Sequence, residues 1–288
     1  MTTPPTAALA PKDIRLRDVP ALRGAFWVRQ GFSVFFARPV AFSCLLGLFV
    51  LALLAMAMLP WIGPPLVLGS LPLVTLGFML ATQLALRGQS PGPAVFLVPL
   101  RVDRGRTVAL LKLCLLYALG SAVIMLLCHW IDGGQMAALA ADSAQAASGE
   151  QAEAQAAQAL LNDARLQQGM LWRLALGSVL SMVFWHAPGL VYWGGQDAAK
   201  SLFFSTVAVW RTKAAFLVYA LVGVALLLGF GLLVGLVLAL LGQPPQWAGV
   251  VVMPGMLTFA SVFYASLFFT FADSFELLPR EPQEPAAA

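Results

Sequence analysis

Long apolar runs separated by short polar segments dominate the chain. A helix needs about 20 apolar residues to cross the hydrocarbon core of a bilayer, which is about 30 Å thick. Six runs are long enough, and we expect each of them to form a transmembrane helix. They lie at about residues 40–59, 65–86, 107–130, 170–193, 214–242 and 247–272. The pattern therefore predicts an all-α fold, a polytopic membrane helical bundle with six transmembrane helices.

The segments outside these runs divide the rest of the chain. Residues 1–21 and 276–288 are rich in Pro, Ala and polar side chains, so we expect flexible cytoplasmic tails on either side of a membrane domain at 22–275. The first tail has no apolar stretch of the kind that signal peptides carry. Residues 131–169 are an insertion rich in Ala and Gln, a composition that favours helix. We expect this insertion to form a helical hairpin on the outer face.

A segment rich in aromatic and basic residues precedes each odd-numbered span. Such segments favour amphipathic helices that lie in the membrane interface, with Trp27 and Trp210 as interfacial anchors. The recurrence indicates a threefold internal repeat of interfacial segment, span, short outer turn and span. The alternative is that any basic interfacial segment would have this composition. The three segments cover 26–42, 93–111 and 198–216 and contain Phe35, Phe96 and Phe203.

Composition and charge support the membrane interpretation. Hydrophobic residues make up 60% of the chain and charged residues only 10%, with a mean hydropathy of +0.84. A soluble domain has about 25% charged residues, so a soluble domain and a nucleic-acid-binding domain are both excluded. Of the 17 Lys and Arg residues, all but Arg165 and Arg173 lie on one side of the predicted spans. The positive-inside rule then places both termini in the cytoplasm.

The basic residues at this face are candidates for binding lipid. Anionic headgroups attract each nearby Lys or Arg by about 1 kcal/mol, so membrane lipids, anionic ones above all, are the expected partners. Asp273 and Glu276, at the end of the last span, are expected to pair with Lys200, Arg211 or Lys213. The candidate headgroup contacts are Arg23, Arg29, Arg38, Arg104, Arg106, Lys200, Arg211 and Lys213.

One cluster inside a span could carry chemistry. Trp185, His186 and Pro188 lie in the fourth span, where an ionisable group is costly and often functional. Pro188 removes a backbone N–H and predicts a local kink. The imidazole of His186 could be a structural group that is hydrogen-bonded to a freed carbonyl or a nearby hydroxyl. It could also be a proton relay or a ligand.

Motifs of known enzymes are missing from the sequence. The chain lacks GxSxG, HExxH, GxxxxGK[ST] and GxGxxG. The three cysteines lie in apolar runs without the spacing of a metal site. We therefore expect no enzymatic activity, no cofactor and no metal.

Three stretches of the chain resemble a known family. They are GAFWVRQGFSVFFARPVAF, PLVTLGFMLATQLALRGQ and FWHAPGLVYWGGQDAAKSLFFSTVAVWRTKAAFLVY. Over residues 24–275 the sequence resembles an uncharacterised family of six-span proteobacterial inner-membrane proteins. The resemblance implies a shared architecture and a place in the bacterial plasma membrane. The family has no assigned activity, so the resemblance implies no catalytic residue.

Two functions remain open after the sequence is read. The first is a non-enzymatic scaffold or membrane-organising factor with lipid-surface helices on its cytoplasmic side. The second is a transporter of a small solute or lipid that uses the proline-broken even spans around His186. The two differ in one feature, because a transporter needs a continuous polar or hydrated path along the bundle.

Overall fold

The computed structural model describes residues 12–59, 62–139, 158, 162–243 and 248–279. Within them, six helices are long and apolar enough to cross a membrane. Each begins and ends within a few residues of the predicted span, so the all-α bundle is confirmed. The spans are α2 (Pro39–Ala57), α3 (Gly63–Leu86), α4 (Arg104–Asp132), α7 with α8 (Ala164–Phe184 and Ala187–Tyr192), α10 (Lys213–Leu240) and α11 (Ala248–Ser274).

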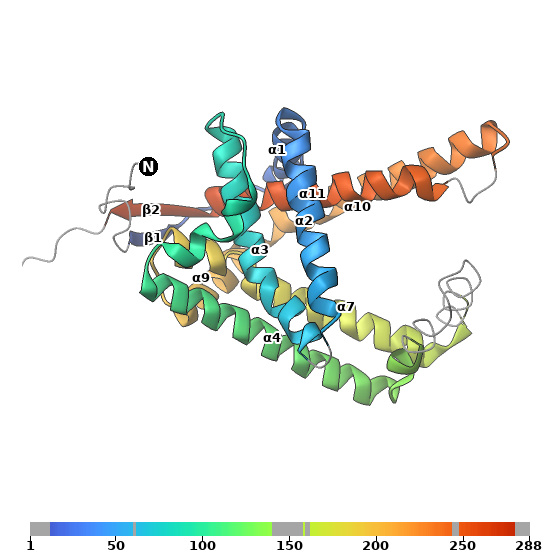
Figure 1. Cartoon of the computed structure of the whole chain (residues 1–288), viewed down its shortest axis with the longest axis horizontal. Coiled ribbons are helices and arrows are strands. Elements are labelled where there is room, and N and C mark those ends of the chain that lie inside the picture. Colours follow the sequence, from blue (N-terminus) through green and yellow to red (C-terminus); the bar gives the residue numbers. More distant parts are fainter. Residues whose placement is uncertain (1–11, 60–61, 140–157, 159–161, 244–247, 280–288) are drawn as a thin grey trace, which may run out of the picture.

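The spans form three consecutive hairpins, α2–α3, α4–α7 and α10–α11. Figure 1 shows that the ends of the α4–α7 and α10–α11 hairpins farthest from the two strands lie well apart from one another. A connecting segment precedes each hairpin. Two of the segments are helices, but the middle one consists of two 3₁₀ turns, so an amphipathic helix over 93–111 was the wrong prediction. The segments are α1 (Arg23–Ala37), η2 with η3 (Pro93–Phe96 and Val98–Arg101) and α9 (Ala198–Arg211).

The connecting segments pack in a cyclic order. The turns η2 and η3 lie against α3 of the first hairpin, and α9 lies against α7 and α8 of the second. The first segment, α1, has no hairpin before it and packs instead against α10 and α11 of the last. This arrangement agrees with a threefold repeat whose ends meet. The Phe residues proposed as repeat markers are not equivalent, however, because Phe35 is buried whereas 63% of Phe203 is exposed.

Two glycines bring α1 close to the last hairpin. A Cβ atom at Gly24 would collide with the backbone carbonyl of Ala215 in α10, and a Cβ atom at Gly31 would lie 2.7 Å from the carbonyl oxygen of Val262 in α11. Only a residue without a side chain permits this approach. These two glycines of α1 therefore allow the helix to pack closely against α10 and α11.

A small sheet joins the two ends of the bundle. Strand β1 (Lys12–Leu16) pairs antiparallel with β2 (Phe275–Pro279), with Ile14 opposite Leu277. The two strands lie side by side in Figure 1. Residues 12–16 had been expected in a flexible tail and residues 276–279 in another, and neither strand was predicted. We call this end of the molecule the strand end.

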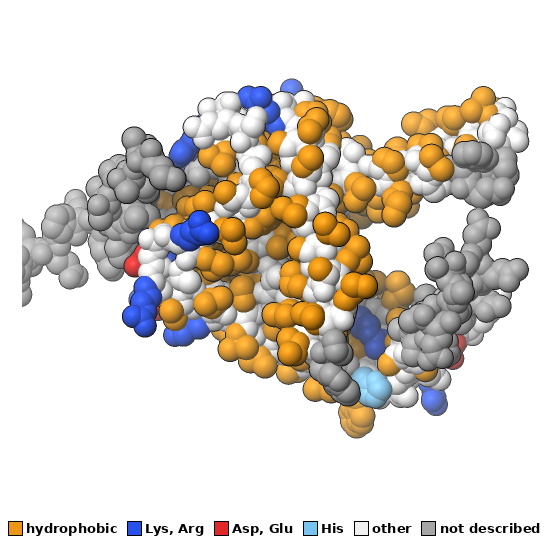
Figure 2. All heavy atoms as spheres, viewed as in Figure 1, with side chains coloured by type: hydrophobic (Ala, Val, Ile, Leu, Met, Phe, Trp, Pro, Cys, Tyr) orange, Lys and Arg blue, Asp and Glu red, His pale blue; other side chains and the backbone are white. Residues whose placement is uncertain are grey.

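Aromatic side chains fill the centre of the bundle, where α2, α3 and α11 meet. Phe78 stacks on Tyr264 with their ring centroids 4.6 Å apart, and Phe49 meets both rings edge-on. The parts of the spans away from this centre are much less buried. In the most apolar 18-residue stretch of α10, for example, only 6% of the residues are buried. Figure 2 shows hydrophobic side chains over much of the visible surface. Such a surface is suited to contact with lipid.

The insertion between the third and fourth spans is described only at its ends. Helix α4 ends at Asp132, and Gly133 follows in the left-handed conformation that commonly ends a helix. Residues 135–139 are helical. The side chain of Asp163 caps the start of α7 by accepting hydrogen bonds from two backbone N–H groups. Residues 140–157 and 159–161 lie outside the described residues, so the helical hairpin over 131–169 stays a prediction.

Candidate functional site

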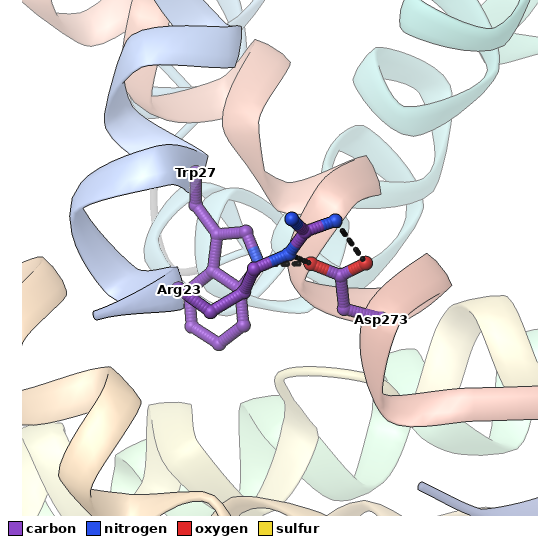
Figure 3. Close-up of polar contacts among 3 residues, drawn as sticks. All are labelled: Arg23, Trp27 and Asp273. Atoms are coloured by element: carbon purple, nitrogen blue, oxygen red, sulfur yellow. Dashed lines mark hydrogen bonds and ion pairs between the residues drawn. The ribbon is translucent and has the colours of Figure 1, made fainter. Parts of the chain in front are cut away.

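A three-residue polar cluster ties α1 to the end of α11 (Figure 3). The Nε and Nη2 atoms of Arg23 donate to the carboxylate of Asp273 at 2.6 and 3.2 Å, and Nε1 of Trp27 donates to it at 2.7 Å. The hydrogen bond to Asp273 and the charge of that carboxylate raise the pKa of the Arg23 guanidinium above its ordinary value. The cluster joins the first helix of the bundle to the last.

This cluster corrects two expectations. Asp273 pairs with Arg23 and not with a basic residue of the α9–α10 region. Trp27 is completely buried and is not an interfacial anchor, because its indole N–H is used by Asp273 and its ring packs against Phe216. By contrast, 71% of Trp210 is exposed, as an interfacial anchor requires.

Four of the eight candidate headgroup contacts have partners within the protein. Arg23 binds Asp273, Arg38 donates to the carbonyl of Gly88 at 2.7 Å, and Arg211 pairs with Asp18 at 3.1 Å. Arg106 is buried and also interacts within the protein. Arg23, Arg38 and Arg106 are therefore poor candidates, whereas Arg211 stays half-exposed and its pair with Asp18 is weak. The exposed candidates are Arg29, Arg104, Lys200, Arg211 and Lys213.

On the face shown in Figure 2, Lys and Arg side chains lie mainly along the upper and left edges, and a few lie at the lower right. A third ion pair lies at the end of the bundle opposite the strand end. There, Nη1 of Arg173 donates to the carboxylate of Asp132 at 2.6 Å, and the Asp132 side chain is completely buried. This bond joins α4 to α7.

The predicted kink in the fourth span is a break between two helices. Helix α7 ends at Phe184, and α8 begins at Ala187 with Pro188 in its first turn. Trp185 donates from Nε1 to the hydroxyl of Thr270 in α11 at 3.1 Å. A proline in the first turn of a helix costs no hydrogen bond, because the N–H groups there have no partner within the helix.

His186 lies at this break and is completely buried. Its backbone N–H donates to the hydroxyl of Ser205 in α9 at 3.0 Å. Among the described residues, however, neither imidazole nitrogen has a hydrogen-bond partner. The ring is surrounded by aromatic side chains, with centroids 5.2 Å from that of Phe275 and 5.9 Å from that of Phe216. The expected hydrogen bond from the imidazole to a carbonyl or hydroxyl is therefore not made.

An apolar groove of about 720 Å³ lies between helices α7 and α10, which diverge from one another. Val183 of α7 and Gly223 of α10 line its two sides, Val262 of α11 lines its floor, and Val28 of α1 and Val209 of α9 line the part near the strand end. Five helices from distant parts of the sequence build this groove. No local pattern in the sequence signals this groove, so it was not predicted.

Comparison with known proteins identifies the family. A protein of Burkholderia thailandensis, named "Probable inner membrane protein BTH_II0599", is 30% identical to this chain over 276 residues, which cover 95% of this chain and 97% of the relative. The chain belongs to this family of inner-membrane proteins. No family model and no solved structure matches it.

Family membership and the six apolar helices together establish a multi-pass protein of the bacterial inner membrane. The relative's name states no activity. Within the described residues, no group of three or more His, Cys, Asp or Glu side chains could hold a metal ion. Membership of the family thus establishes the location of the protein in the inner membrane but not its activity.

Proposed function

We propose that the protein is a non-enzymatic scaffold that organises the inner membrane, and that its cytoplasmic end binds anionic lipids. The pairing of polar groups with one another inside the described spans supports this role. Tyr219 and Ser266 share a hydrogen bond of 2.6 Å, and Thr82 donates to the carbonyl of Ala265 at 3.1 Å. Groups used in this way hold helices together and offer little to a polar solute.

Both termini of this scaffold are proposed to lie in the cytoplasm. The support is the distribution of the 17 Lys and Arg residues, together with the strand pair that holds the two ends of the bundle at one end. Reporter fusions at residues 150 and 288 test this orientation, and we expect the second alone to report a cytoplasmic position. Reports of the same side from both fusions would overturn the six-span topology.

The exposed basic side chains are proposed to select anionic lipids. Arg29, Arg104 and Lys200 are exposed, and each should contribute about 1 kcal/mol near an anionic surface. The test reconstitutes the full chain in bilayers of phosphatidylglycerol and phosphatidylcholine and measures, with spin-labelled lipids, which lipid contacts the protein. We expect a preference for phosphatidylglycerol that falls at high salt, because salt screens exposed charges.

A matched pair of triple variants separates charge from shape. Changing all three residues to Gln should abolish most of the preference for phosphatidylglycerol. The control, Arg29→Lys with Arg104→Lys and Lys200→Arg, keeps the charge and should keep the preference. An equal preference in the wild type and in the Gln variant would refute the proposed lipid contacts.

One observation favours the transporter alternative. The two imidazole nitrogens of His186 and the hydroxyls of Ser201 and Ser274 are buried without a partner among the described residues. Buried polar groups of this kind are costly and often functional. Proteoliposomes with an entrapped pH dye test the alternative. Proton uptake by the wild type that vanishes in His186→Gln would replace the scaffold with a proton-coupled transporter.

A further inference from the structure

The apolar groove runs along the half of α10 that is nearest to the strand end. Its lining on this helix extends from Lys213 to Leu227, about 21 Å at 1.5 Å per residue. The hydrocarbon core of a bilayer is about 30 Å thick. Ala215, two residues beyond Lys213, contacts Gly24 at the start of α1, which places this end of the groove at the strand end. The groove therefore spans the membrane leaflet on that side.

The polar atoms along the groove have partners inside the protein. The Tyr219 hydroxyl is bonded to Ser266, the Thr206 hydroxyl donates to the carbonyl of Leu202 at 2.8 Å, and the Trp185 indole donates to Thr270. A polar solute would lose its hydration in such a groove without gaining hydrogen bonds. A hydrocarbon chain loses nothing there, so the walls favour an acyl chain.

A cation stands at the strand end of the groove. The Nζ atom of Lys213 lies 4.6 Å from the centroid of the exposed Trp210 ring, and the side chain is exposed. Across the described parts of the chain, no carboxylate forms a salt bridge with it. An ammonium group has three N–H donors, and phosphate oxygens are strong acceptors for it.

From these three features we infer that the groove is a binding site for one anionic phospholipid. Its acyl chains lie against α7, α10 and α11, and its phosphate is held by Lys213 beside Trp210. The inference rests on the anionic-lipid part of the proposed function and assigns it a site. It differs from general attraction at the surface, because a groove holds a lipid in a fixed ratio of one to each protein.

Gly223 allows the groove to be filled without disturbing the fold. A Cβ atom added there has no neighbour within 4 Å, and the residue lines the groove. Gly223→Leu should therefore place its side chain in the lipid's space. Gly229→Leu is the matched control, because that glycine is on the same helix, also has no neighbour within 4 Å and does not line the groove.

The experiment titrates delipidated protein with phosphatidylglycerol or phosphatidylcholine and counts retained lipids by native mass spectrometry. We expect the wild type and Gly229→Leu to retain one phosphatidylglycerol, and Gly223→Leu to bind it at least tenfold more weakly. Lys213→Gln should reduce the preference for phosphatidylglycerol about fivefold, the factor that corresponds to about 1 kcal/mol per charge. Lys112→Gln, an exposed change on α4 away from the groove lining, should not change it.

Two results would overturn the groove site. Equal retention by Gly223→Leu and the wild type would place the bound lipid elsewhere. A dimer in the wild type that Gly223→Leu converts to monomers, with no change in bound lipid, would show that a second copy of the chain covers the groove. One phosphatidylglycerol still retained by the Gln triple variant would support the groove site, and it would do so even if that variant kept the surface preference and thereby refuted the lipid contacts of the proposed function.

Discussion

Replacing Asp273 with Asn tests the contact that closes the bundle. The substitution keeps the size of the side chain and one acceptor oxygen but removes the charge. A hydrogen bond to a charged group contributes about 1.5–3 kcal/mol, and the bond from Trp27 should have this strength because the Trp27 ring is completely buried. The pair with Arg23 should contribute at most about 1 kcal/mol, because 41% of the Arg23 side chain is exposed.

The expected loss follows from these contributions. Asn can still accept one neutral bond from Trp27, which restores about 1 kcal/mol. Asp273→Asn should therefore lower the free energy of unfolding by about 2 kcal/mol, and Asp273→Ala should lower it further because the buried indole N–H is left unpaired. Glu276→Gln, an exposed change of the same charge three residues away, should change it by less than about 0.5 kcal/mol.

Unfolding of the detergent-solubilised protein by added SDS gives these free energies. Double-mutant cycles with Trp27→Phe and with Arg23→Gln then separate the two partners of Asp273. We expect the coupling energy to Trp27 to exceed the coupling energy to Arg23. A larger coupling to Arg23, or no effect of Asp273→Asn, would refute the reasoning from burial.

Three further predictions use the same unfolding assay. Gly24→Ala should cost about 1–3 kcal/mol because its Cβ collides with the backbone of α10, whereas Gly47→Ala, with no neighbour within 4 Å, should not destabilise; equal effects would contradict the close approach. Arg173→Leu should cost about 3–5 kcal/mol because it leaves the completely buried Asp132 carboxylate without its charged partner, and Asp132→Leu with Arg173→Leu should recover most of the loss. His186→Leu should leave stability within about 0.5 kcal/mol or raise it, because the imidazole has no partner to lose; a loss above about 1 kcal/mol would reveal a hidden partner.

The number and position of the spans could be predicted from the sequence. The thickness of the bilayer sets the length of each apolar run, and this constraint acts locally. The break at residues 185–186 was predictable for the same reason, because Pro188 affects only its own turn. A local rule sufficed in each case.

Contacts between distant segments could not be predicted in this way. Arg23 and Asp273 are 250 positions apart, and several basic residues were equally plausible partners for that carboxylate. The burial of Trp27 depends on α10, and the groove depends on five helices. The sequence also shows that His186 lies inside a span, but it does not show that aromatic rings surround the imidazole and leave it without a hydrogen bond.

The packing of α1 against α10 and α11 sets the order in which the protein can be completed during synthesis. Ribosomes add about 5–20 residues per second, so the 250 positions between Arg23 and Asp273 take about 12–50 s to make. Through that interval the face of α1 that bears Trp27 has no protein partner from the last hairpin. The first helix to emerge must therefore wait at the membrane until the last span has been inserted. Only then can the ring of hairpins close and β1 meet β2.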